Sequence, residues 1–287
     1  MAPILVLIRP QQWIKNLFVA APLFFTPAAL SPGAVGRVAL GVGCFSALAS
    51  AMYVLNDWCD RESDRQHPRK RLRPLAAGEV GTAPALLLAL GLAAASFAIA
   101  LLLLPFAFTQ VLVGYAGLNL AYSFGLKRIA ILDVLLIAIG FVLRIYGGGF
   151  LIGVVPTVWI VACTLLLALF LALAKRRDDI VRGMEAGHRP SLAGYNAPFL
   201  DTAIAIVLAA LLVSYLLYTT QPQNMARLHS DKLFLTVPFV IAGVLRYLQI
   251  TIVEHRSGSP TRLAVTDRFL LLAILGWIVT FALLIYV

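Results

Sequence analysis

The sequence predicts an all-α fold, a polytopic bundle of nine transmembrane helices with a cytoplasmic N-terminus, forming a single domain over residues 1–287. Composition is the first reason, because 61% of the residues are hydrophobic and 13% are charged, whereas soluble globular proteins carry about 25% charged residues. The second is a series of apolar stretches of about 20 residues, the length that crosses a bilayer as a helix. The third is that basic residues gather at alternate junctions between these stretches, as membrane topology requires.

Each predicted helix is an apolar stretch that ends at a turn residue or a charged run. The first opens at Pro10 and Trp13, which suit a helix start and the membrane interface. Gly and Pro separate the first span from the second, the third from the fourth, the fifth from the sixth and the seventh from the eighth, and charged runs separate the others. The nine spans cover residues 13–30, 36–56, 83–104, 107–123, 130–152, 155–174, 200–219, 234–253 and 268–286.

The distribution of charge predicts the orientation. Of the 23 Lys and Arg residues, Arg37, Arg227 and Lys232 lie in outer segments, and Arg144 and Arg246 lie within spans. All the others lie in inner loops or at inner helix ends, so the positive-inside rule places the N-terminus in the cytoplasm and the C-terminus outside. Nearly all acidic residues also lie inside, which topology does not require. We therefore expect the inner face to be the functional one.

A polar island, residues 56–64, follows the second span. Its aspartates Asp57, Asp60 and Asp64 stand at i, i+3 and i+7, which places them within about 60° of one another on a helix. Carboxylates are costly at a membrane and persist mainly where they pair or bind a ligand. Mg²⁺ typically binds through one or two carboxylates plus substrate phosphates. The island therefore predicts a Mg²⁺ site for a phosphorylated substrate, and the alternative is a solvated helix end with ion pairs to neighbouring arginines.

Basic residues mark two other inner turns. The run Lys175-Arg176-Arg177 closes the sixth span, where it would either hold phosphate oxygens or serve as a topology signal and a partner of the helix dipole. Lys127 and Arg128 lie in the turn between the fourth and fifth spans. Lys15, just inside the first span, would either extend to the interface or turn toward a cavity.

Arg144 lies about halfway across the fifth span, on nearly the same helix face as Asp133 and roughly 16 Å from it in height. An ionisable residue at this depth indicates a functional site, and the alternative is an arginine satisfied by carbonyls or polar neighbours inside the bundle. The glycines at 147–149 would let another helix approach closely. Arg246 in the eighth span has no acidic partner at helical spacing.

Two motifs resemble those of a known family. The pattern Asn56-Asp57-x-x-Asp60-x-x-x-Asp64 resembles the first aspartate motif of the UbiA superfamily of intramembrane prenyltransferases, and Tyr122-Ser123 with Lys127-Arg128 resembles its inner-loop tyrosine/lysine motif. The resemblance covers essentially the whole chain and implies that Asp57, Asp60 and Asp64 are catalytic and bind Mg²⁺. It also implies substrate binding by residues at the inner ends of the spans: Lys15, Asn56, Tyr122, Lys127, Arg128, Arg144, Lys175 and Arg176.

The chain departs from most of that superfamily after the sixth span, where members usually carry a DxxxD-type motif and this chain has the basic run at 175–177 followed by Asp178-Asp179. This version, with residues 9–16 and 143–148, resembles the branch of decaprenyl-phosphate phosphoribosyltransferases. The resemblance implies a glycosyltransferase of the inner (plasma) membrane with its active site facing the cytoplasm. Such an enzyme moves 5-phosphoribose from phosphoribosyl pyrophosphate to a polyprenyl (decaprenyl) phosphate and releases pyrophosphate, for synthesis of cell-wall arabinan precursors. The implied partners are these two substrates and the membrane, with no nucleic acid, and a homo-oligomer is left open.

The residue chemistry agrees with this branch. Two substrates with three anionic groups call for more basic residues than one diphosphate does, and an acceptor that is already an anion needs no strong general base.

Two other functions are weighed against it. A UbiA-type prenyltransferase with a prenyl diphosphate donor and an aromatic acceptor would use the same aspartates, and the altered second motif argues against it. A transporter for an anionic lipid or metabolite would use Asp133, Arg144 and Arg246 to line a route. The concentration of acids on one face argues against that reading.

Overall fold

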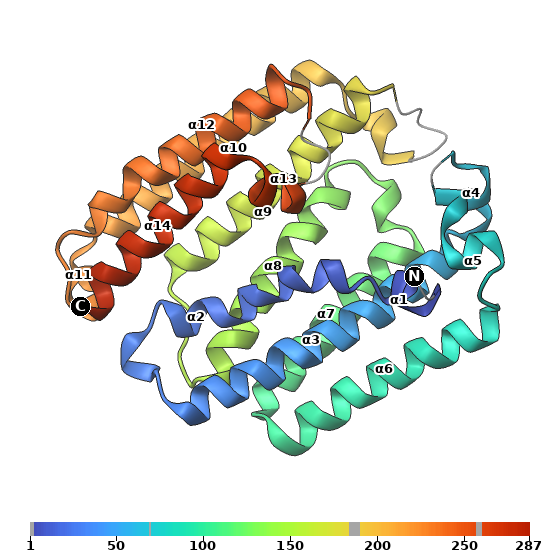
Figure 1. Ribbon diagram of the computed structural model, residues 1–287, viewed down its shortest axis with the longest axis horizontal. Coiled ribbons are helices and arrows are strands. Elements are labelled where there is room, and N and C mark those ends of the chain that lie inside the picture. Colours follow the sequence, from blue (N-terminus) through green and yellow to red (C-terminus); the bar gives the residue numbers. More distant parts are fainter. Residues whose placement is uncertain (1–2, 69, 184–189, 257–259) are drawn as a thin grey trace. The chain divides into compact units, whose positions relative to one another are not determined.

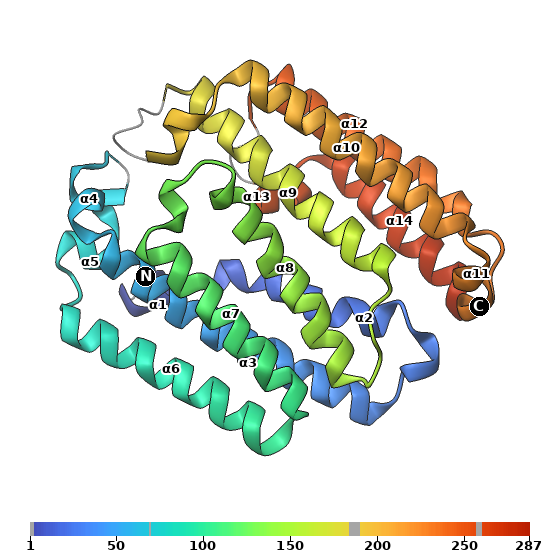
Figure 2. The same ribbon diagram turned by 180° about the vertical axis from the view of Figure 1, so that it is seen from behind.

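The computed structural model describes residues 3–68, 70–183, 190–256 and 260–287, and over these residues its regular elements are all helices (Figures 1 and 2). Arg69, Glu185 and Arg189, which the sequence places in inner loops, lie outside the described residues. Contacts divide the chain into two compact units, residues 1–129 with 140–156, and residues 130–139 with 157–287. The helix α8 (Leu132–Leu151) belongs to both. The single domain remains a prediction.

Unit 1 is built around α3, a 28-residue helix. Ser31 begins it, since the Ser31 hydroxyl accepts a hydrogen bond from the Ala34 N–H at 3.2 Å and Pro32 occupies the first turn. α3 lies beside α6 and α7 and is also contacted by η1 (Figure 1). In order, the elements of unit 1 before α8 are α1 (Pro3–Ile8), η1 (Pro10–Ala20), α2 (Ala21–Phe24), η2 (Pro27–Ala29), α3 (Pro32–Cys59), α4 (Arg61–Gln66), η3 (Lys70–Leu72), α5 (Pro74–Ala77), α6 (Thr82–Leu103), α7 (Phe106–Phe124) and η4 (Leu126–Arg128).

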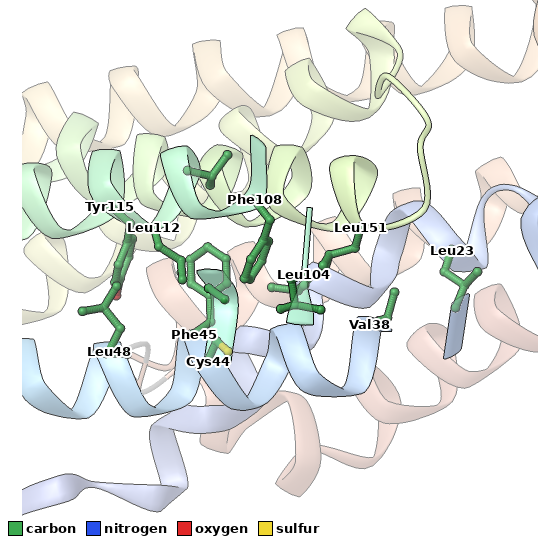
Figure 3. Packing of buried hydrophobic residues seen from close by; sticks show 14 of the residues in the cluster. Leu23, Val38, Cys44, Phe45, Leu48, Leu104, Phe108, Leu112, Tyr115 and Leu151 are labelled. Atoms are coloured by element: carbon green, nitrogen blue, oxygen red, sulfur yellow. The ribbon is translucent and has the colours of Figure 1, made fainter. Parts of the chain in front are cut away.

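Aromatic side chains form the centre of the unit 1 core (Figure 3). The Phe45 ring meets Phe108 and Tyr115 edge-on, with centroids 5.7 and 5.3 Å apart. Gly148 lies against η1 so closely that a Cβ atom there would stand 2.0 Å from the Val19 carbonyl oxygen. The predicted close approach at the glycine run is therefore confirmed, and it binds α8 to the N-terminal segment.

Unit 2 consists of the first part of α8 and two pairs of long helices. α9 lies beside α10, and α12 lies beside α14. Phe170 of α9 and Tyr247 of α12 meet edge-on with centroids 5.0 Å apart. The elements after α8 are α9 (Val158–Val181), η6 (Pro190–Gly194), α10 (Ala197–Thr220), α11 (Pro222–Leu228), η7 (Leu233–Thr236), α12 (Val237–Ile252), α13 (Pro260–Thr266) and α14 (Arg268–Tyr286).

Seven segments among the described residues are helical, long and apolar enough to cross a membrane: Pro32–Cys59, Thr82–Leu103, Leu132–Leu151, Val158–Val181, Ala197–Thr220, Leu233–Ile252 and Arg268–Tyr286. They coincide with seven of the nine predicted spans. The predicted span 13–30 is instead divided among η1, α2 and η2, because Pro22 and Pro27 lack the N–H that a continuous helix needs. The predicted span 107–123 is α7, a continuous 19-residue helix. Its apolar sequence contains polar residues such as Thr109, Gln110 and Asn119.

Candidate active site

The three aspartates of the polar island lie where α3 passes into α4. α3 ends at Cys59 and α4 begins at Arg61, yet the backbone keeps helical register across the junction. The Asp60 N–H donates to the Asn56 carbonyl at 2.9 Å, and the Asp64 N–H donates to the Asp60 carbonyl at 2.8 Å. The predicted i, i+3, i+7 alignment of the carboxylates is therefore present.

Two arginines from other segments hold Asp57, which is 2% exposed. Arg9 Nη2 donates to both carboxylate oxygens, at 2.6 and 2.7 Å. Arg73 Nη1 donates to Asp57 Oδ1 at 2.9 Å and to Asp64 Oδ2 at 2.6 Å. Arg73 therefore links the first and last aspartates of the motif.

Asp64 is as deeply buried as Asp57, also 2% exposed. Burial raises the pKa of the Asp64 carboxyl above its ordinary value, and the charges of Arg73 and Lys70 only partly oppose this. Lys70 Nζ stands 4.0 Å from Asp64 Oδ1. Lys70 and Arg73, which follow the island in the sequence, thus lie against its Asp64 carboxylate.

Asp60 is bonded to the inner turn after α7. Lys127 Nζ donates to Asp60 Oδ1 at 2.6 Å and to Asn56 Oδ1 at 2.8 Å. The Asn56 amide in turn donates to Asp60 Oδ2 at 3.1 Å, and the Ser123 hydroxyl donates to Asn56 Oδ1 at 3.3 Å. The structure therefore joins the aspartate motif to the tyrosine/lysine motif, two segments that lie about 70 residues apart in the chain.

A cavity of about 430 Å³ opens beside this junction. Arg128 is exposed at the cavity wall, and Tyr122 is half-buried one residue before the lining. The lining combines two arginines and one glutamate with polar and apolar side chains: Trp58, Cys59, Arg61, Glu62, Ser123, Phe124 and Arg128. This combination suits an amphipathic phosphorylated ligand.

Lys15 lies half-buried on η1, and its neighbour Asn16 is buried. Asn16 accepts a hydrogen bond from Arg144 Nε at 2.9 Å, while the other guanidinium nitrogens donate to the Gly140 carbonyl at 2.8 Å and the Tyr115 hydroxyl at 3.0 Å. The guanidinium also lies over the Tyr115 ring, 4.7 Å from its centroid. Packing inside the bundle therefore accounts for Arg144 without a ligand, and its role in substrate binding remains a prediction.

In unit 2, the basic run at the end of α9 divides into exposed and buried residues. Lys175 is exposed, whereas Arg176 is 1% exposed and donates from Nε to Asp133 Oδ2 at 2.7 Å. The Ser191 and Tyr195 hydroxyls donate to the same carboxylate at 2.9 and 2.7 Å. Arg176 is thus one member of a buried ion pair, and phosphate binding by this residue remains a prediction.

Arg246 has acidic partners that its spacing along the helix did not indicate. Its Nη2 donates to Asp267 Oδ2 at 2.6 Å and its Nη1 to Glu254 Oε1 at 2.8 Å. Helical spacing could not indicate these partners, because both acids lie beyond the end of α12, where the helical period no longer applies. Asp133 likewise bonds to Arg176, and Arg144 bonds to Asn16, so the two charges of the fifth span have separate partners.

A model of the UbiA prenyltransferase family matches residues 16–269. The chain belongs to the UbiA prenyltransferase family. The decaprenyl-phosphate phosphoribosyltransferase of Mycobacterium tuberculosis is 33% identical over 285 residues, which cover 95% of this chain and 91% of that protein. The protein of the same name from Corynebacterium glutamicum is 32% identical over 286 residues, 98% of this chain and 86% of that protein. A solved UbiA homologue from Archaeoglobus fulgidus bound to DMAPP and Mg²⁺ has the same fold, with a TM-score of 0.73 over 99% of each chain at 23% identity.

This UbiA family member is thus a transferase and an integral, multi-pass membrane protein. Its aspartates offer carboxylate oxygens with an amide oxygen beside them, the hard donors that Mg²⁺ takes. Over the described ranges, no three His, Cys, Asp or Glu side chains already stand as a metal-binding group. The oxygens of the three aspartates are bonded instead to Arg9, Arg73, Lys127 and Asn56. The donor chemistry fits Mg²⁺, and binding the ion requires these partners to move.

Arg9 and Arg73 are the site residues that sequence reasoning missed in this UbiA protein. Arg73 is nine residues beyond Asp64, across a turn, so helical periodicity could not place it. Arg9 precedes Asp57 by 48 residues. A signal was present in their charge, because both are basic residues close in sequence to predicted site residues.

Proposed function

We propose that the protein transfers 5-phosphoribose from phosphoribosyl pyrophosphate to a polyprenyl phosphate, at the cytoplasmic face of the inner membrane. The observation that carries this proposal is the sequence identity of about one third to proteins named decaprenyl-phosphate phosphoribosyltransferase, along nearly the whole chain. The junction of Asp57, Asp60, Asn56 and Lys127 supports it, because carboxylates and a cation meet there at the C-terminal end of α3. Decaprenyl phosphate is the acceptor that the relatives' name suggests.

In the proposed reaction, an oxygen of the lipid phosphate attacks C1 of the ribose. The bond from C1 to the pyrophosphate oxygen breaks, and its electron pair leaves with pyrophosphate, so inversion at C1 is expected. Mg²⁺, when held by Asp57, Asp60 and Asp64, neutralises the charge that develops on the leaving group. The acceptor is already an anion and needs no base.

The basic residues bind and orient the phosphates. Lys127, which reaches Asp60 and Asn56, would hold a phosphate oxygen next to the metal carboxylates. Arg128 at the cavity wall, Lys15 on η1 and the exposed Lys175 of α9 are proposed phosphate ligands on the same grounds of charge. Tyr122, just before the cavity lining, is proposed to contact the substrate.

The test is turnover of radiolabelled phosphoribosyl pyrophosphate with decaprenyl phosphate, using purified protein in detergent. Asp57→Asn and Asp60→Asn should lower the rate by about 100-fold or more, since each removes a charge from the metal site. Glu79→Gln is the matched control, because Glu79 is an exposed acid that follows α5 and is outside the cavity lining. Near-normal rates in both aspartate variants would contradict the metal assignment.

A second arm decides the donor. The same preparation is given a prenyl diphosphate and an aromatic acceptor such as 4-hydroxybenzoate. Prenyl transfer without phosphoribosyl transfer would overturn the proposal in favour of a UbiA-type prenyltransferase. Transfer of neither group, with movement of an anionic lipid across vesicles, would favour a transporter.

A further inference from the structure

The three aspartates make hydrogen bonds and ion pairs with other groups of this chain. Asp57 accepts from Arg9 and Arg73. Asp64 accepts from Arg73 and lies near Lys70. Asp60 accepts from Lys127 and the Asn56 amide. The six carboxylate oxygens that a metal would take therefore already have cationic or amide partners.

Arg73 holds the central place in this arrangement. A single nitrogen, Nη1, lies 2.9 Å from Asp57 Oδ1 and 2.6 Å from Asp64 Oδ2. A divalent ion that joined the same two carboxylates would compete for the position of this nitrogen. Arg73 is also partly exposed, with 25% of its side chain accessible, so its guanidinium has room to turn away from the carboxylates.

Arg9 reaches Asp57 from a strained backbone. Its φ of 52° and ψ of 59° lie in the left-handed region, which is unfavourable for a residue with a Cβ. The contacts that offset this cost are the two bonds to Asp57 and the Tyr53 ring, whose centroid is 5.2 Å from the guanidinium. A conformation held by its side-chain contacts is released when those contacts are exchanged for others.

The balance of charge shows what such an exchange needs. Three carboxylates face Arg9, Arg73 and Lys127 within hydrogen-bond distance. Displacing a half-buried arginine from its carboxylate is costly unless another anion takes its place. A metal ion alone brings only positive charge, whereas a metal diphosphate brings both the ion for the carboxylates and phosphate oxygens for the arginines.

We propose that Arg73 and Arg9 exchange counterions when substrate binds, passing from the aspartates to the diphosphate as the metal takes the carboxylates. Free divalent ions consequently bind the protein weakly, and the metal and the diphosphate enter together. The proposal rests on the proposed function only in taking a metal-bound diphosphate group as the ligand of this site.

The experiment measures two affinities of the full-length protein in detergent and compares Arg73→Gln with the unchanged chain. The first is for Mn²⁺ alone, followed by electron paramagnetic resonance. The second is for radiolabelled pyrophosphate in excess Mg²⁺. Arg73→Gln should bind Mn²⁺ about tenfold more tightly and magnesium pyrophosphate about tenfold more weakly, the change expected for one charge-assisted hydrogen bond. Arg71→Gln, an exposed residue two positions away, should change neither.

The opposite signs distinguish the exchange from a static brace. If Arg73 only holds the segment before α5 against α4, Arg73→Gln weakens the binding of both Mn²⁺ and magnesium pyrophosphate, or of neither. Either result overturns the proposal. Should Arg73→Gln fail to fold, Arg9→Gln gives the same pair of measurements with the same expected signs. Failure of the proposed function can be recognised separately. If the two affinities change in opposite directions but no phosphoribosyl transfer is observed, the counterion exchange is supported and phosphoribosyl pyrophosphate is rejected as the donor.

Discussion

The buried pair of Asp133 and Arg176 allows a quantitative prediction. Asp133 is fully buried and Arg176 is 1% exposed. The variant Asp133→Asn keeps the size of the side chain and removes the negative charge 2.7 Å from Arg176 Nε. It also replaces one acceptor oxygen by an NH₂ group, so only one of the Ser191 and Tyr195 hydroxyls, which bond to different oxygens, keeps its acceptor. Arg176 would then be a buried cation that has lost this counterion.

Breaking a buried ion pair by removing one partner costs about 3–5 kcal/mol. At about 2 °C per kcal/mol for a chain of this size, Asp133→Asn should lower the apparent melting temperature by roughly 6–10 °C. The double variant Asp133→Asn with Arg176→Met should recover part of that loss, because the buried guanidinium is gone. The recovery should be incomplete, because Asp179, 3.7 Å from Arg176 Nη1, loses one ion-pair partner. The coupling energy between the two changes should reach about 2 kcal/mol.

The assay is thermal unfolding of the four proteins in one detergent, followed by circular dichroism, with turnover measured in parallel. Ser191→Ala is the milder comparison, since it removes one neutral donor to the same carboxylate. Equal melting temperatures for Asp133→Asn and the unchanged protein would refute the reasoning. A loss of turnover in Arg176→Met with unchanged stability would assign Arg176 to substrate phosphate instead.

Two further predictions concern packing and pH. Gly148→Ala should lower the free energy of unfolding by several kcal/mol, because the alanine Cβ would stand 2.0 Å from a backbone oxygen. The measurement is a lower melting temperature. Gly91→Ala, where a Cβ meets open space, should instead stabilise its helix by up to about 1 kcal/mol. A hydrogen bond from Arg246 lowers the pKa of Asp267 to about 2, so the ionised Asp267 stabilises the fold above an unfolded pKa of about 3.9 and loses this effect as pH falls toward 2. Asp267→Asn, which keeps a capping oxygen, should therefore reduce the melting temperature at pH 7 and match the unchanged protein near pH 2, and a constant difference across that range would contradict the charge argument.

Local features of the sequence were sufficient for most of the helices and for the aspartate motif. A run of 20 apolar residues has few alternatives to a membrane helix, because its backbone must be hydrogen-bonded within itself. Seven predicted spans are confirmed as helices long and apolar enough to cross a membrane. The spacing of Asp57, Asp60 and Asp64 followed from the helical period alone, and the backbone hydrogen bonds across residue 60 preserve it. The segment 13–30 is not one continuous helix, because its prolines lack the N–H that such a helix needs.

The partners of the charges depended on tertiary structure. The sequence by itself determined that acids and bases gather at the same ends of the predicted spans, since the charge pattern is a local property of the chain. It could not determine that Arg9 and Arg73 bind the aspartates, that Lys127 bonds Asn56 and Asp60, or that Arg176 is buried against Asp133. Those contacts join residues 9 to 71 positions apart, and only the packing of helices and loops brings such residues within the 3 Å over which a charge-assisted hydrogen bond acts.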